Sequence, residues 1–469
     1  MFMELMAGAE SPRSTSRAAR IFTLALVAAL AVLTLGAIRA EANVYCVAAV
    51  NPTSIHPSCT VGGGRATVAE GLQAALDNPG EDTVRIGPGT FTEDSLSYGS
   101  VAGNPVHIIG SGQVGGPTGT TIARSSAIYG SGGAVIVVSS GGGDVSTISN
   151  LRVEIPANPD GFTDVGIVSW NFGVSQVSVV GPSASNAVGV QFDYGNQSLS
   201  DASINLPFTG DLSNYGVRAL GGYNYEVRDS SIHADFGIDT SSSAVAGKRL
   251  SIEASWRGVD VAGGGGLALD SSLIDLGSNA NGSGVALDYS NPAAQTSGAN
   301  LSGVTIVGGD SNTRGIRVNA GDGDNYAVDA DSVILNGQDL AAEARSTASS
   351  VAALVDLRYS AYDPVKLDEV GAVGTVAEGT GNKTSSSATY PAFVDAAGGD
   401  YRLSASSPLL DSGNPAFNGV LFGPVMDLVR NPRELQSDGG CSPAARADIG
   451  AYEYLHPSPN ATIDSGTDD

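Results

Sequence analysis

One short pattern, a glycine followed by an apolar, a variable and an apolar residue, recurs seven times between residues 145 and 337. Its glycines lie 21 to 31 residues apart. Alternation with period two predicts short strands that bury one face. The segments are Gly166-Ile167-Val168, Gly189-Val190-Gln191-Phe192, Gly216-Val217-Arg218-Ala219, Gly237-Ile238-Asp239, Gly258-Val259-Asp260-Val261, Gly284-Val285-Ala286-Leu287 and Gly315-Ile316-Arg317-Val318.

A second alternating series lies between these segments, set off by Gly, Ser, Asn and Asp residues that favour turns. Its members are Leu151-Arg152-Val153, Val177-Ser178-Val179, Ile204-Asn205-Leu206, Ile232-His233-Ala234, Leu250-Ser251-Ile252, Ile274-Asp275-Leu276 and Val304-Thr305-Ile306. Two or three short strands per repeat of this length are typical of a solenoid.

A single coil of this kind cannot bury its own apolar face, so successive coils must stack like on like, about 4.8 Å apart. The Val, Ile and Leu columns then form one continuous core, and the variable residues form outward ladders. A leucine-rich repeat is the main rival, but its asparagine ladder and leucine consensus are missing. A β-sandwich does not explain the repeated glycine register. The sequence therefore predicts an all-β chain, a parallel β-helix.

The ends of a solenoid need covers, and residues 67–76 have the pattern of one. Thr67 and Glu70 form a capping box, and Val68, Leu72, Ala75 and Leu76 make one apolar helical stripe. The segment Pro88-Gly89-Thr90-Phe91-Thr92-Glu93 follows. It resembles the "pGtYtE" first coil of the pectate-lyase-like family of secreted right-handed parallel β-helices. The resemblance covers residues 67–337 and implies the fold, not an activity.

The N-terminus has the pattern of a secretory signal peptide, residues 1–42. Arg13, Arg17 and Arg20 precede an apolar run, residues 21–35, and small residues follow at a cleavage site. That run is shorter than the roughly 20 residues of a membrane span. No second apolar run of that length follows, so we expect a secreted, extracellular or surface-associated protein without a transmembrane segment. The alanine-rich, lysine-poor composition suggests a bacterial source.

Charge and cysteines restrict the partners and the compartment. The formal charge is −25, and removing residues 1–42 leaves 19 basic and 45 acidic residues, a charge of −26. Such a surface repels nucleic acid and anionic membranes. We expect Cys46 and Cys59 to form a disulfide in an oxidising compartment. Cys441 is then a free thiol, or it replaces one of the other two.

The chain changes character toward its C-terminus. We predict an N-terminal cap at 43–80 with the disulfide loop and the helix, a β-helix at 81–340, an irregular segment or last coil at 341–389, a C-terminal module at 390–456 and an acidic disordered tail at 457–469. The module is similar to the choice-of-anchor Q module of bacterial surface β-helix proteins. The motifs that carry the resemblance are Asp400-Tyr401-Arg402-Leu403, Ser407-Pro408, Asp411-Ser412-Gly413, Asn431-Pro432-Arg433 and Asp448-Ile449-Gly450-Ala451-Tyr452.

Two details of this module are further expectations. Arg430 stands where the family commonly has glycine. Ile449 and Ala451 suggest a last strand, and we interpret Arg433 and Asp448 as a structural ion pair rather than a ligand site.

The second residue after each glycine forms an outward ladder, in which Arg218, Asp239 and Asp260 are consecutive. Carboxylates at that spacing can hold calcium or split their pKa values for acid–base work. A calcium-dependent polyuronate lyase needs such parts, with a basic residue to take the proton. The simpler interpretation, which we favour, is a solvated ladder in which Arg218 offsets Asp239.

Other catalytic signals are weak. The Asn-Thr-Asp, Asp-Asp, Gly-His-Gly and Arg-Ile-Lys motifs of polygalacturonase-like enzymes are absent, and the four histidines have no metal-type spacing. His233 beside Glu253 is interpreted as a surface histidine. An acidic cluster around Asp322 and Asp324 fails the EF-hand template.

Aromatic residues are the remaining candidates for ligand binding. Trp170, Tyr194 and Tyr289 each lie four or five residues past a coil glycine, with Tyr223 and Tyr225 nearby. They can line one edge as a glycan groove, although tyrosines at such positions also shield turns.

These observations favour a non-catalytic extracellular β-helix that is surface-associated or binds a polysaccharide of the surroundings or of the cell envelope. No cofactor is required, and calcium enters only with the lyase. The alternatives are that lyase and, third, an adhesin or protein-interaction scaffold.

Overall fold

The computed structural model describes residues 42–47, 59–60, 64–100, 102–115, 118–124, 133–141, 145–157, 163–182, 186–209, 213–278, 281–288, 296–321, 325–347, 351–387, 389–416, 426–433 and 446–455. Residues 1–41 of the predicted signal peptide lie outside this part of the chain. So do Tyr289, Cys441, the Asp322–Asp324 cluster and the acidic tail.

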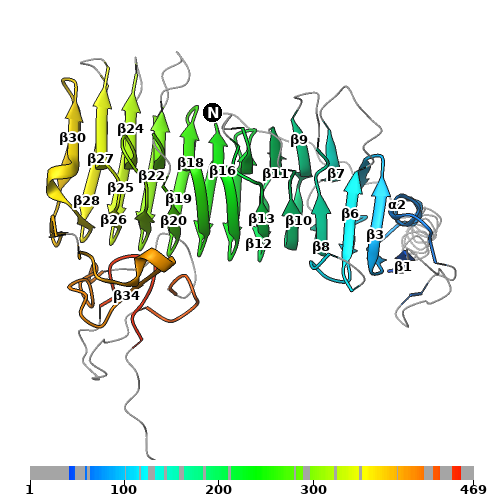
Figure 1. Ribbon diagram of the computed structural model, residues 1–469. Helices are drawn as coiled ribbons and strands as arrows, with labels where there is room; N and C mark the ends of the chain where they lie inside the picture. The colour runs from blue at the N-terminus through cyan, green and yellow to red at the C-terminus, as the bar shows by residue number, and fades with distance from the viewer. Residues whose placement is uncertain are drawn as a thin grey trace, which may run out of the picture.

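The chain forms a right-handed parallel β-helix, as predicted. Each complete coil contributes to three parallel sheets, which we call sheets I, II and III, and successive coils stack along one axis (Figure 1). Sheet I contains β1 (Val44–Val47), β2 (Asp82–Ile86), β5 (Val106–Ile109), the first halves of β8 (Ser146–Glu154) and β10 (Phe172–Val180), β12 (Gln197–Ser200), β15 (Asn224–Arg228), β17 (Ala244–Lys248), β19 (Gly266–Asp270), β22 (Thr296–Ser302), β25 (Asn325–Asp331), β28 (Ala353–Arg358) and β31 (Gly374–Glu378).

Sheets II and III complete the coils. Sheet II contains β3 (Gly89–Glu93), β6 (Thr120–Arg124), the second halves of β8 and β10, β13 (Ser203–Asn205), the first parts of β16 (Ser231–Ser241) and β18 (Ser251–Ala262), β20 (Leu273–Asp275), β23 (Thr305–Val307), β26 (Ile334–Asn336), β29 (Ala361–Tyr362) and β32 (Lys383–Thr384). Sheet III contains β4 (Leu96–Ser100), β7 (Ala134–Ser140), β9 (Asp164–Trp170), β11 (Ala187–Tyr194), β14 (Tyr215–Ala219), the last parts of β16 and β18, β21 (Ser283–Asp288), β24 (Arg314–Ala320), β27 (Leu340–Ser346) and β30 (Leu367–Val370).

The repeated glycines have a steric cause. Gly258 points into the coil where sheet II turns into sheet III. A Cβ atom there would lie 2.5 Å from the carbonyl oxygen of Gly284, the equivalent glycine of the next coil, and would also strike the Ile274 side chain. The same crowding, by the next glycine's carbonyl and an Ile or Val side chain, recurs at Gly166, Gly189, Gly216, Gly237 and Gly284. Glycine is therefore required by close packing between coils.

The N-terminal end is covered as expected. Helix α2 (Val68–Leu76) starts with the predicted capping box, in which the Glu70 amide donates to Thr67 Oγ1 over 3.1 Å. Val68, Leu72 and Ala75 are buried in the main core. The predicted disulfide is present, with the Cα atoms of Cys46 and Cys59 5.9 Å apart. In Figure 1, α2 lies at one end of the stack.

The stacked strands continue past residue 340. Strand β28 pairs with β31, and β29 pairs with β32, so parallel pairing reaches Thr384. Of the two alternatives for residues 341–389, further coils describe most of this stretch. The domain limits themselves remain a prediction. Among the described residues no helix has both the length and the apolar character needed to cross a membrane.

Beyond Thr384 the chain turns back and packs against the outer side of sheet II, below the last coils in Figure 1. It contains β33 (Phe393–Asp395), η2 (Ala396–Gly398) and β34 (Asp400–Leu403), of which the two strands pair antiparallel. Its small core joins Leu403, Leu409 and Ile449 to Ile334 of the β-helix.

Two expectations for this segment were wrong. Residues 449–452 form no strand; the Ala451 amide instead donates to Thr305 Oγ1 of the β-helix, 2.8 Å away. Arg433 contacts the main-chain carbonyl of Asp448, at 3.2 Å, and forms an ion pair with Glu453. The Asp448 carboxylate accepts from main-chain amides instead, at 2.7 Å from Asp411 N. Around these residues, side-chain oxygens accept hydrogen bonds from the main-chain amides of loops in place of strand pairing.

Arg430 adopts a φ of 67°, in the left-handed region that favours glycine. Its side chain pairs with Asp201 at 2.9 Å and with Asp229 at 3.2 Å, both on the β-helix. The arginine thus gains contacts at a position where its backbone conformation is unfavourable.

Candidate functional site

The predicted charged ladder is present on the outer face of sheet III. Arg218 is the register partner of Asp239, and Asp239 is the partner of Asp260. The ladder continues on both sides with Gln191 and Ala286. These residues are far apart in the chain but adjacent in space because equivalent positions of successive coils stack.

Arginines engage both carboxylates. Arg218 Nε donates to Asp239 Oδ2 over 3.0 Å. Arg257, three residues before Asp260, contacts both Asp260 and Asp288 through its two terminal nitrogens. The side chains of Asp239 and Asp260 are only 11% and 15% exposed. The array is therefore a mostly closed ion-pair network.

The same network extends across two further coils. Arg317 lies 3.6 Å from Asp288 and 3.9 Å from Glu343. The Glu343 side chain, 2% exposed, also pairs with Arg314 at 2.8 Å and Arg345 at 3.1 Å. Such a carboxylate needs this compensation, because an uncompensated buried charge is costly. A structural role explains these contacts.

Burial changes the proton affinity of both candidate carboxylates. It raises the pKa of Asp239, against the opposing effect of Arg218. Burial likewise raises the pKa of Asp260 to about 6; Arg257 opposes this shift and Asp239 adds to it. A carboxyl group with such a pKa can exchange a proton near neutrality. Its low exposure, however, leaves little room for a substrate to reach it.

The ladder does not fit a calcium ion. Calcium takes six to eight oxygen ligands, whereas guanidinium groups already occupy positions beside Asp239 and Asp260. In the described part of the chain, no three His, Cys, Asp or Glu side chains converge where a metal ion could be held.

A second candidate site lies at the corner where sheet III turns into sheet I. Trp170 ends β9, Tyr194 ends β11, and Tyr223 precedes β15, one coil after another. Their rings form a row, with centroids 5.8 Å apart between Trp170 and Tyr194 and 5.9 Å between Tyr194 and Tyr223. We call these three residues the aromatic row.

The aromatic row is exposed and held in place. Trp170, Tyr194 and Tyr223 are 40%, 54% and 41% exposed, although large aromatic side chains usually seek burial. Trp170 Nε1 donates to Asp193 Oδ2 over 2.8 Å, and Gln191 holds the other oxygen of Asp193. The edge-to-face contacts between neighbouring rings further restrict them. An ordered, solvent-facing apolar surface results.

The next two coils have only small residues at this corner, at 241–243 and 262–265, and a hollow opens there. It has a volume of about 640 Å³ and lies over β15, β17, β19 and β22. Tyr223 and Asn224 border it on the side of the aromatic row, and Asn300 on the opposite side. Its floor consists of small residues: Ser242, Ala244, Ala246, Gly264, Gly266, Ala268 and Gly298. The aromatic row thus leads into an open groove.

The aromatic residues proposed from the sequence lie in different environments. Trp170 and Tyr194 are neighbours at one edge, as expected, and Tyr223 joins them. Tyr225 is buried and stacks on Phe192 with ring centroids 5.1 Å apart. Tyr289 lies outside the described residues. The hollow itself was not predicted, because it depends on which side chains are missing from the corners after Tyr223.

The histidines behave as surface residues where the structure describes them. His233 Nδ1 lies 2.9 Å from Glu253 Oε2, its register partner on β18, and its ring stacks on Phe208. His107 lies 3.1 Å from Glu81, far along the stack. Neither is part of the aromatic row or the charged ladder.

No protein-family model matches this chain, and no curated protein is similar to it. Solved structures with similar folds include an alginate lyase from Paenibacillus sp., at a TM-score of 0.41 and 13% identity, with 66% of this chain and 97% of that chain covered. A pectate lyase is matched at a TM-score of 0.40 and 14% identity, over 89% and 98% of the two chains. The A-module of a mannuronan C-5 epimerase from Azotobacter vinelandii is matched at 0.35 and 15%, over 67% and 89%. Likeness at this level says nothing of what this chain acts on.

Proposed function

We propose that this protein is a secreted, non-catalytic β-helix that binds a neutral polysaccharide along the aromatic row and the adjoining hollow. The exposed row of Trp170, Tyr194 and Tyr223 is the observation that carries the proposal. Sugar rings present apolar C–H faces, which can cover such aromatic surface, and hydroxyls, which need hydrogen-bonding partners. Trp and Tyr also dominate the energy of many binding surfaces.

The hollow supplies the rest of such a site. Its floor of small residues lets a chain approach the backbone of β17 and β19, while Asn224 and Asn300 offer amide groups at its borders. Its volume of about 640 Å³ lies within the range of about 300–1,000 Å³ of small-molecule sites. Because the row and the hollow follow the stack axis, an extended polymer suits them better than a compact ligand.

Charge favours a neutral polymer. A formal charge of −25 repels polyanions at long range. A calcium bridge could offset this repulsion, but the described residues provide no cluster of ligands for one. We therefore expect neutral glycans to bind and uronate polymers to bind weakly or not at all.

The location of the protein is part of the proposal. The signal-like segment at residues 1–42 supports export, and the resemblance of residues 390–456 to a choice-of-anchor module supports association with the cell surface. The glycan would then be one of the surroundings or of the envelope. A polyuronate lyase acting through Arg218, Asp239 and Asp260 is the less favoured alternative, because arginines close both carboxylates.

Replacing Trp170, Tyr194 and Tyr223 together by alanine is expected to weaken glycan binding at least tenfold, a loss of about 1.4 kcal/mol or more. The measurement is retardation in affinity gels containing neutral glucans, xylans or mannans, followed by titration calorimetry with the best oligosaccharide. The matched control is Phe208→Ala, which removes another exposed aromatic ring from a different face. It should leave binding unchanged.

The same panel separates the alternatives. Equal retardation of the wild type and the triple variant on every retarding glycan would contradict the proposal. Release of unsaturated uronates from a polyuronate, lost in Asp239→Asn and Asp260→Asn, would establish the lyase in its place.

A further inference from the structure

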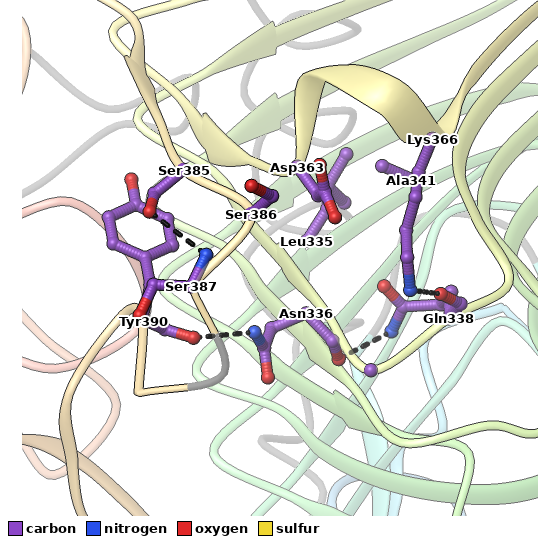
Figure 2. A pocket seen from close by; sticks show the side chains of 11 residues that line it. Leu335, Asn336, Gln338, Ala341, Asp363, Lys366, Ser385, Ser386, Ser387 and Tyr390 are labelled. Atoms are coloured by element: carbon purple, nitrogen blue, oxygen red, sulfur yellow. Dashed lines mark hydrogen bonds between the residues drawn. The ribbon is translucent and has the colours of Figure 1, made fainter.

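A pocket lies at the other end of the β-helix, where the chain leaves the last coil (Figure 2). Its volume is about 380 Å³. Three segments line it: residues 335–341 at the turn from β26 to β27, residues 363–366 in and before η1 (Pro364–Lys366), and residues 385–387 with Tyr390 after β32. It lies between sheets II and III, at a different corner from the aromatic row, and is independent of the site proposed above.

One wall carries an ammonium group that no carboxylate neutralises. Lys366 Nζ donates to the main-chain carbonyl of Gln338 over 2.5 Å, and among the described residues it forms no ion pair. An ammonium group has three donors, so two remain available. In a chain with 48 acidic residues and only three lysines, a half-buried lysine without an acidic partner is unusual.

Hydrogen bonds hold this wall rigid. Gln338, only 1% exposed, donates through Nε2 to the carbonyls of Ile306, Gly308 and Asn336 at 3.0 to 3.2 Å. The main-chain carbonyl of Gln338 is therefore fixed in the position where it accepts the hydrogen bond from Lys366. Figure 2 shows the lysine side chain descending from η1 onto this carbonyl, along the edge of the pocket.

Other lining residues offer hydroxyl-binding groups. Asp363 uses Oδ1 to accept from Val365 N at 3.2 Å, which leaves Oδ2 as an acceptor. The departing segment contributes Ser386, whose hydroxyl has no partner among the described residues. This segment is itself tied down, since Ser387 N donates to Ser385 Oγ and Asn336 Nδ2 donates to the Tyr390 carbonyl at 2.9 Å.

Size and charge together restrict the ligand. The pocket is near the lower end of the range of about 300–1,000 Å³ for small-molecule sites, which suits one sugar ring better than a chain. One ammonium group matches one negative charge. Asp363 lines the same pocket, so a phosphate dianion would add one more unpaired negative charge beside it than a carboxylate would. Leu335 and Ala341 complete the lining, and both are almost fully buried.

We propose that this pocket binds a single sugar acid, with its carboxylate on Lys366 and its hydroxyls on Asp363 and Ser386. The site combines one charge-assisted contact with neutral hydrogen bonds. The carboxylate contributes most of the affinity, because hydrogen bonds to charged groups are about twice as strong as neutral ones.

Titration calorimetry of the full chain with sodium glucuronate tests this proposal, with glucose and sodium acetate as the other arms. Glucuronate should bind saturably and at least tenfold more tightly than either. Lys366→Met should weaken glucuronate binding at least tenfold, and Ser386→Ala severalfold. Lys383→Met, the same change at an exposed lysine outside the pocket, should have no effect.

Three outcomes would overturn the proposal: no glucuronate binding by the wild type, unchanged binding in Lys366→Met, or acetate binding as tightly as glucuronate. Circular dichroism melting verifies that each variant is folded. The triple alanine variant of the aromatic row should bind glucuronate like the wild type, so failure of one site does not imply failure of the other.

Discussion

Replacing Gly258 by valine is expected to destabilise the β-helix by about 3 kcal/mol or more, at or above the upper end of the usual 1–3 kcal/mol for overpacking. The new Cβ would lie 2.5 Å from the Gly284 carbonyl oxygen and would strike Ile274. A flexible side chain could move aside, but the carbonyl belongs to the adjoining strand β21. Relief therefore requires the two coils to separate locally, which breaks hydrogen bonds and opens the core.

The measurement is urea unfolding followed by circular dichroism. Gly173→Val is the matched control, because Gly173 points outward on β10 and a Cβ there would meet Thr147 at an ordinary 3.5 Å. The control should stay within about 0.5 kcal/mol of the wild type. Equal stability of Gly258→Val and Gly173→Val would mean that the glycine column does not pack as described. Long repeat arrays need not unfold in two states. If the unfolding curve shows separate transitions, the variants are compared at the transition that Gly258→Val shifts.

Arg433→Met is expected to destabilise the docked C-terminal segment by about 3–5 kcal/mol, the usual cost of removing one partner from a buried charge network. The arginine side chain is fully buried and donates to the carbonyls of Gly303 and Gly450, at 3.4 Å and 2.6 Å. It also lies 3.9 Å from Glu453. Methionine fills a similar volume but leaves the carboxylate and the carbonyls without this cation.

Hydrogen exchange of residues 390–455 and limited proteolysis report this loss directly, because the segment should detach before the β-helix unfolds. Arg402→Met is the matched control: Arg402 is 62% exposed and pairs with Asp400 on the surface. Surface pairs contribute about 0–1 kcal/mol, so the control should show wild-type protection. Unchanged protection in Arg433→Met would show that this network does not hold the segment.

The stacked part of the chain could be predicted because its causes recur. Each coil needs glycine at the same crowded corner, so the glycine register predicts the coils. Stacking then predicts which distant residues are neighbours, and Arg218, Asp239 and Asp260 lie in that order. The sequence did not show that Arg257 would pair with the carboxylates and shield them from solvent. Arginine directly precedes the repeated glycine in only one other of the seven segments, as Arg314.

The C-terminal segment follows no repeat, and the two structural details predicted there, a last strand and an Arg433–Asp448 ion pair, were wrong. Its contacts join residues with no periodic relation, such as Arg430 and Asp201, 229 positions apart. Alternating residues around Ile449 suggested a strand, yet their amides bond to Leu409 and to the β-helix instead. The pocket around Lys366 was missed for the same reason, because three unrelated segments build it.

Residues about one repeat apart occupy the same outward position, and this stacking brings the aromatic row together. Ala246 and Ala268 are register partners on β17 and β19 and both face outward. In a Cys441→Ser background, cysteines at these two positions should form a disulfide on mild oxidation, because partner Cα atoms about 4.8 Å apart permit one. Cysteines at Ala244 and Ala268 would be about 8 Å apart, beyond reach.

Peptide mass mapping without reduction distinguishes the two variants. We expect nearly complete cross-linking of Ala246→Cys with Ala268→Cys and little or none of Ala244→Cys with Ala268→Cys. Equal cross-linking of both pairs, or cross-linking of the second pair alone, would contradict the stacking on which the fold and the aromatic row depend.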